Sequence, residues 1–162
     1  MEKLKTKRRK RIKWELGDVF GAELPNGEFA LLQAIDFNMM NILYVAITDK
    51  KIKNASDALP TLESPDIISL IAVVKHDLEF QDGFLRLGTQ KSIAQKSEFK
   101  NERFKDNGYI GAKMYDAGLA RDFLAAYHKL APWDKWYDPN YLDEFLISPE
   151  KKPKGLVYLK NQ

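Results

Sequence analysis

The residue types that carry out most enzyme chemistry are sparse in this chain. It contains two histidines, His76 and His128, and no cysteine. The densest group of possible metal ligands is His76, Asp77 and Glu79. If residues 75–80 are extended, His76 and Asp77 point to opposite faces of the strand. A two-metal hydrolase needs several convergent ligands, and carboxylates alone could hold only a hard cation such as Mg²⁺. A solvated strand end is the simpler interpretation.

Patterns for nucleophilic catalysis and for phosphate binding are also missing. The sequence has no G-x-S-x-G elbow, and the run from Gly83 to Gly88 matches neither a Walker A loop nor a dinucleotide-binding fingerprint. Asp143 and Glu144 are paired carboxylates, but neighbouring residues on a helix do not face each other. His128 lies near the end of a predicted helix, where a favourable contact with the helix dipole is expected. We therefore predict no catalytic residue, no metal and no cofactor.

The richest candidate for a binding surface is the segment from Trp133 to Phe145. It combines two tryptophans, two tyrosines and one phenylalanine with four acids. Aromatic rings anchor interfaces, and carboxylates steer and pair with Lys or Arg on a partner. Alternatively, the rings pack a helical layer onto a sheet and the acids are only solvated. The candidate partner-binding residues are Trp133, Asp134, Trp136, Tyr137, Asp138, Tyr141, Asp143 and Glu144.

Positive charge is concentrated at the N-terminus. Residues 1–13 hold eight of the 26 Lys and Arg and one acid, so a chain of net charge +3 has a mildly acidic remainder. Such an arm can contact a nucleic-acid backbone, grip an acidic partner or simply be solvated. It has no aromatic side chain before Trp14, which disfavours stacking on single strands. The candidate nucleic-acid-binding residues of this alternative are Lys7, Arg8, Arg9, Lys10 and Arg11.

The middle of the sequence predicts strands. Residues 19–24 and 28–35 flank Pro25-Asn26-Gly27, a strong hairpin signal. Residues 41–48 are rich in β-formers, and these three strands predict an antiparallel meander. We expect a buried strand at 67–75, after a helix-start signal at 64–66, and a short strand at 84–87. Ile12 and Trp14 could form the edge of the first strand. Residues 88–108 are polar and are the expected mobile segment.

The C-terminal third predicts helices. Leu119, Phe123, Tyr127 and Leu130 share one helical face, with Asp116 as the cap and Pro132 marking the end. A second short helix is expected after Asp138-Pro139, and a last edge strand at 156–159. The prediction is an α+β fold: a strongly bent antiparallel sheet or small barrel of residues 14–88, covered on one face by C-terminal helices. Residues 1–13 form a basic arm on a single domain of residues 14–162.

The opening of the chain resembles immunity protein family 26 of bacterial polymorphic toxin systems. The shared pattern is a basic lead-in, then Gly17-Asp18-Val19-Phe20, an apolar strand, a Pro-Asn-Gly turn and the return strand Phe29-Ala30-Leu31. Segments 71–74 and 83–88 look similar to later family elements, although Phe84 stands where the family favours Trp. The resemblance covers roughly half of the chain, rests on a folding motif, and transfers no catalytic residue.

The resemblance implies a small cytoplasmic protein that binds and neutralises a cognate toxin. We expect it to occlude the active site or an essential surface of the toxin's C-terminal domain. Many toxin domains are nucleases with cationic clefts, which suits an acidic body. One alternative is a nucleic-acid-associated domain that uses the basic arm, and another is a small metal-dependent, phosphotriesterase-like hydrolase. No apolar stretch is long enough to span a bilayer, so no membrane partner is expected.

Overall fold

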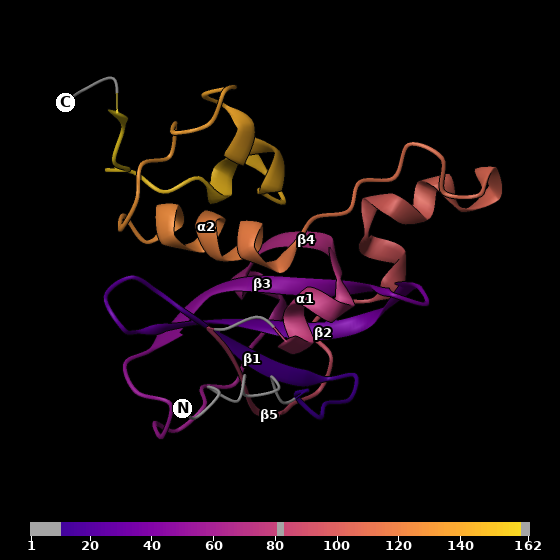
Figure 1. The fold of residues 1–162 in the computed structure, drawn as a ribbon, viewed down its shortest axis with the longest axis horizontal. Coiled ribbons are helices and arrows are strands. Elements are labelled where there is room, and N and C mark those ends of the chain that lie inside the picture. The colour runs from indigo at the N-terminus through magenta and orange to yellow at the C-terminus, as the bar shows by residue number, and fades with distance from the viewer. Residues whose placement is uncertain (1–10, 81–82, 160–162) are drawn as a thin grey trace, which may run out of the picture.

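The computed structural model describes residues 11–80 and 83–159 (Figure 1). One antiparallel sheet of five strands forms its centre, in the order β4-β3-β2-β1-β5. The sheet is open, so the α+β class is confirmed and the small-barrel variant is not adopted. The strands are β1 (Asp18–Glu23), β2 (Phe29–Met39), β3 (Ile42–Ile52), β4 (Ile67–Val74) and β5 (Phe84–Thr89).

Two helices accompany the sheet, together with short 3₁₀ turns. Helix α1 (Lys75–Phe80) leads out of β4, and α2 (Ala117–Tyr127) lies across one face of the sheet (Figure 1). The 3₁₀ turns are η1 (Ser64–Asp66), η2 (Lys96–Glu98), η3 (Lys100–Asn107), η4 (Tyr141–Phe145) and η5 (Pro149–Lys151). The predicted cap of α2 is confirmed, because the Asp116 side chain accepts a hydrogen bond from the Leu119 N–H at 2.8 Å.

The first hairpin forms where its turn residues predict it. The Leu24 N–H donates to the Glu28 carbonyl at 2.8 Å, and Gly27 takes the positive φ of 86° that its turn needs. Gly17 is restricted too: its φ is 94°, and a Cβ there would lie 3.1 Å from the Gln90 carbonyl oxygen. Backbone conformation at Gly27, and conformation together with close packing at Gly17, therefore explain why glycine occupies these two positions.

Side chains cover both faces of the sheet. The larger core joins the α2 side of the sheet to α2 and the C-terminal turns, through Phe20, Phe123 and Phe145 among others. On the other face, Tyr44 stacks on Phe99 with ring centroids 4.3 Å apart. The C-terminal layer expected on one face is present, and the opposite face is covered by residues 59–62 and 93–99.

The first part of the polar segment 88–108, expected to be mobile, packs onto the sheet: Ala94, Phe99 and Asn101 are buried, whereas residues 105–108 are exposed. The buried Gln33 side chain holds its beginning: Nε2 donates to the carbonyls of Gly17, Gln90 and Lys91 at 3.0–3.1 Å, and Oε1 accepts from the Ile93 N–H at 2.9 Å. The hydrogen bonds of one buried side chain on β2 therefore hold the start of a segment that has no apolar pattern of its own.

Three predicted elements differ from the structure. The strand expected at 67–75 ends at Val74, and residues 75–80, considered as extended, form α1. Residues 156–159 form no strand; instead, the Trp133 N–H donates to the Val157 carbonyl at 2.8 Å. Ile12 and Trp14 form no strand edge, because β1 begins only at Asp18; the Trp14 ring packs on Phe20 and Phe37 with centroids 6.1 and 5.9 Å away.

Candidate functional site

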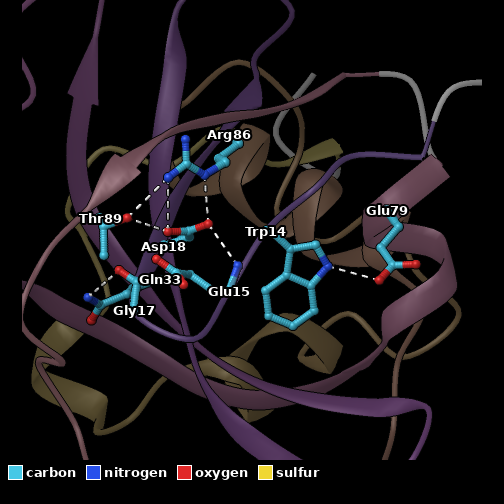
Figure 2. A network of polar contacts seen from close by, with 8 residues as sticks. All are labelled: Trp14, Glu15, Gly17, Asp18, Gln33, Glu79, Arg86 and Thr89. Carbon is cyan, nitrogen blue, oxygen red and sulfur yellow. Dashed lines mark hydrogen bonds and ion pairs between the residues drawn. The ribbon is translucent and has the colours of Figure 1, made fainter.

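A buried carboxylate links the first strand to the last (Figure 2). Asp18 is completely buried, and it accepts hydrogen bonds from Arg86 Nε at 2.7 Å, from Thr89 Oγ1 at 2.5 Å and from the Glu15 N–H at 2.9 Å. Burial alone raises the pKa of a carboxyl, but these hydrogen bonds outweigh it and lower the pKa of Asp18. Asp18 is therefore ionised at neutral pH, and it holds β5 against β1.

A second buried carboxylate anchors the end of the basic arm. Glu79 of α1 accepts a hydrogen bond from Trp14 Nε1 at 2.8 Å (Figure 2). It also pairs with Arg11 at 3.0 Å and with Lys75 at 3.3 Å. Burial opposes its charge, but these donors outweigh burial and lower the pKa of Glu79. Arg11, a candidate nucleic-acid contact, thus has an internal partner. The other four candidates of that alternative, residues 7–10, lie outside the described residues.

The aromatic and acidic segment 133–145 divides into a buried and an exposed part. Trp133 is fully buried, and its Nε1 donates to Asp143 Oδ1 at 2.7 Å. Asp143 also pairs with Lys152 at 2.9 Å. Asp134 is buried and accepts the Leu159 N–H at 2.7 Å. Three of the eight candidate partner-binding residues therefore hold the C-terminal layer together. Trp133 and Asp134 are buried, whereas the paired Asp143 side chain remains 38% exposed.

The other five candidates lie at the surface. Tyr137 is fully exposed, and Asp138 and Glu144 are exposed as well. Glu144 pairs with Lys113 at 3.1 Å. Trp136 and Tyr141 are half-buried and contact each other with centroids 5.5 Å apart. These residues give the segment an aromatic surface with carboxylates beside it.

A cleft of about 580 Å³ lies where Trp136 and Tyr141 meet α2. Its charged lining is mainly acidic, with Glu23 from the end of β1, Asp116 and Asp122 set against Arg121. Asp122 lies 3.8 Å from Lys135, and the Arg121 guanidinium donates to the Glu23 carbonyl at 3.1 Å. We call this feature, together with the exposed Tyr137, the acidic cleft.

Sequence reasoning found only one side of the acidic cleft. Asp116 was identified as a helix cap, and Glu23 and Asp122 carried no signal of their own. Asp122 does sit next to the buried Phe123 in α2, so the helical pattern turns it away from the core. Glu23 is about 100 residues away in sequence, and only the packing of α2 on the sheet brings it to the same cleft.

The Trp136 indole adds an unusual feature to the acidic cleft. Its Nε1 is buried and has no hydrogen-bond acceptor among residues 11–80 and 83–159. The Lys135 ammonium lies 5.0 Å from the ring centroid, within the range of a cation–π contact. An aromatic ring with an unused donor beside carboxylates is a common composition for an interface anchor.

The histidines take no part in such a site. Glu79 of the predicted cluster is engaged with Arg11, Trp14 and Lys75. Within the described residues, no three His, Asp or Glu side chains are grouped so as to hold a metal ion. The expected dipole contact of His128 is wrong at neutral pH, because burial lowers the pKa of His128 to about 4 and leaves the ring neutral.

Comparison with known proteins identifies no relative. No family model, no curated protein and no solved structure matches this chain. The resemblance to immunity protein family 26 therefore remains a prediction from the N-terminal motif. Separately, the described part of the chain contains no helix that is long and apolar enough to cross a membrane.

Proposed function

We propose that this chain works by binding, as a cytoplasmic immunity protein that neutralises a cognate bacterial toxin domain. The observation that carries the proposal is the acidic cleft, where carboxylates from β1 and α2 surround a half-buried tryptophan and tyrosine. The family resemblance of residues 1–31 supports the same class of function. The proposal requires no reaction, only an interface that covers the toxin's active site or another essential surface.

The chemistry of the acidic cleft selects the kind of partner. Three carboxylates and one guanidinium line it, so a surface rich in Lys and Arg is the complementary one. Trp136 and Tyr141 supply rigid aromatic area, which often dominates binding energy, and the fully exposed Tyr137 extends it. A nuclease domain with a cationic, phosphate-binding cleft fits this description, and covering that cleft would block its substrate.

Co-expression tests this proposal in cells. The C-terminal domain of the proposed cognate toxin, sought among the products of the neighbouring genes, is expressed with the wild-type chain or with the variant Glu23→Lys/Asp122→Lys. We expect the wild type to protect growth and the variant to lose protection, because both substitutions place like charges against a cationic partner. Circular dichroism and an unfolding curve verify that the variant remains folded.

A matched control separates charge at the cleft from charge in general. Asp49→Lys/Asp106→Lys makes the same double charge reversal at two exposed positions that do not line the acidic cleft, and it should protect like the wild type. Full protection by Glu23→Lys/Asp122→Lys would remove the cleft as the binding surface. Failure of the wild-type chain to protect against, or to co-purify with, that toxin domain would contradict the proposed function itself.

A further inference from the structure

The outer edge of β4 is covered at both ends by the chain's own backbone. Towards one end, the Tyr115 N–H donates to the Ala72 carbonyl at 3.0 Å and the Val74 N–H donates to the Tyr115 carbonyl at 2.9 Å. Towards the other, the Ile147 N–H donates to the Ile68 carbonyl at 2.7 Å. Even-numbered residues of β4 thus direct their backbone groups away from β3, as the alternation of a strand requires.

The edge is open between these two attachments. Leu70 lies midway, and its register with Ala46 is part of an unbroken ladder to β3. By the same alternation, the N–H and C=O of Leu70 and the N–H of Ala72 face away from β3. None of these three groups has a hydrogen-bond partner among the described residues. Ile68 and Ala72 are four residues apart, so the gap spans about 13 Å. Unpaired strand edges of this kind are templates for another strand.

A pocket of about 340 Å³ lies in front of this gap. Leu70 and Ala72 line one side of it, and residues of η3 and η4 contribute to its other walls. Most of its walls are apolar, including Phe99, Phe104, Phe145 and Ile147. The volume is within the range of small-ligand sites, and the walls suit one or two apolar side chains.

The rim of the pocket carries more available positive charge than negative. Lys100 and Arg103 are exposed on η3, and the described residues offer neither of them an ion-pair partner. Lys113 and Glu144, which also line the pocket, neutralise each other at 3.1 Å. Glu98 accepts the Gln95 N–H at 2.6 Å and keeps its charge, so Lys100 and Arg103 leave the rim with an excess of one positive charge. An occupant with a carboxylate next to its apolar part is therefore the complementary one.

We propose that this pocket binds an extended peptide segment of a partner protein, which adds a short strand to the edge of β4. The segment's backbone would satisfy the Leu70 N–H and C=O and the Ala72 N–H, its apolar side chains would fill the pocket, and an acidic side chain would face Lys100 and Arg103. Only a peptide offers donors and acceptors at the spacing of the open edge. This site lies on the other side of η4 from the acidic cleft and does not depend on the proposed function.

An NMR titration tests the site directly. The probe is a pool of acetylated, amidated tetrapeptides with glutamate at both ends and valine, leucine, isoleucine or phenylalanine at the two central positions. We expect the amide signals of Leu70 and Ala72 to shift and their hydrogen exchange to slow at least tenfold. The same pool with N-methylated central amides should have little effect, because its backbone donors are removed. Absence of shifts at Leu70 and Ala72 at millimolar pool concentration would overturn the proposal.

Variants of the chain give an independent readout of affinity. Leu70→Pro removes an outward N–H that takes no part in pairing with β3, so the sheet should tolerate it, and binding of the pool should weaken at least tenfold relative to Leu70→Ala. Arg103→Glu should weaken it similarly, whereas Lys105→Glu, on the same turn but outside the pocket, should not. Binding of decanoate with no binding of peptides, or equal effects of Arg103→Glu and Lys105→Glu, would contradict the assignment.

Discussion

Replacing Asp18 by asparagine isolates the role of its charge. Oδ2 of Asp18 accepts from Arg86 Nε at 2.7 Å and from the Glu15 N–H at 2.9 Å, while Oδ1 accepts from Thr89 Oγ1 at 2.5 Å. An asparagine can keep its oxygen at the Oδ2 position and so retain the acceptor for Arg86 Nε and the Glu15 N–H. Its amide, at the Oδ1 position, reverses the Thr89 hydrogen bond and loses the 3.4 Å bond from Arg86 Nη2, so the substitution removes the negative charge with little change of shape.

The size of the effect follows from the burial of the two partners. A hydrogen bond to a charged group contributes about 1.5–3 kcal/mol. The Asp18 side chain is completely buried, but the Arg86 side chain is 41% exposed, so solvent screens the pair. We therefore expect Asp18→Asn to lower the free energy of unfolding by about 1.5 kcal/mol. Asp18→Ala also leaves the Glu15 N–H without its acceptor, and we expect it to cost about 3 kcal/mol.

Urea unfolding at pH 7, followed by tryptophan fluorescence, measures both values. The pH dependence gives a second test. Because the pKa of Asp18 is lower in the folded protein than the unfolded value of about 3.9, its stabilisation is present above pH 4 and is lost as the pH falls through the folded pKa. Asp18→Asn should remove that part of the acid sensitivity. Losses below 0.5 kcal/mol for both variants, or an unchanged acid profile, would refute the reasoning.

Three further predictions concern the other buried groups and the exposed aromatic. Glu79→Gln should lower the free energy of unfolding by about 1–2 kcal/mol, because three donors lose a charged acceptor; an unchanged urea midpoint would mean that Glu79 does not anchor Trp14 and Arg11. Trp133→Phe should lower the free energy of unfolding by about 2 kcal/mol, because it loses the Asp143 hydrogen bond and leaves space in the core. Tyr137→Ala should change it by less than about 0.5 kcal/mol, because Tyr137 is fully exposed. Equal losses would contradict the division of segment 133–145 into a buried and an exposed part. The pKa of His128 is about 4 in the folded protein and about 6.5 in the unfolded chain, so protonation of His128 favours the unfolded chain. The free energy of unfolding should therefore fall by about 1–2 kcal/mol, allowing for solvent screening, as the pH drops from 6.5 to 4. If the stability of His128→Leu falls as steeply with pH as that of the wild type, His128 is not the cause.

Local patterns predicted the parts of the fold that local physics determines. The Asn26-Gly27 turn, the β-branched runs of the strands and the apolar face of α2 each act within a few residues, and each is present. The run 156–159 has strand-forming residues but no partner strand, because hydrogen bonds to Trp133 and Asp134 take up its backbone. The strand propensity of a short run does not reflect hydrogen bonds made by residues that are distant in sequence.

The candidate site was predicted in part for the same reason. Composition alone drew attention to residues 133–145, since two tryptophans and four acids in 13 residues are conspicuous. Composition could not tell that Trp133 donates to Asp143 while Trp136 and Tyr141 border a cleft. No acid of residues 133–145 lines that cleft; its three carboxylates, Glu23, Asp116 and Asp122, are brought together only by tertiary packing. Glu79 likewise meets Trp14 across 65 residues of sequence.

Binding of a cationic toxin domain at the acidic cleft can be measured by calorimetric titration of the purified chain with the C-terminal domain of the proposed cognate toxin. We predict that Glu23→Lys/Asp122→Lys weakens binding at least 100-fold, which is about 2.7 kcal/mol, while Asp49→Lys/Asp106→Lys stays within twofold, and that added salt weakens the wild-type complex. Equal affinity of both variants for the toxin domain, with no dependence on salt, would contradict binding at the acidic cleft.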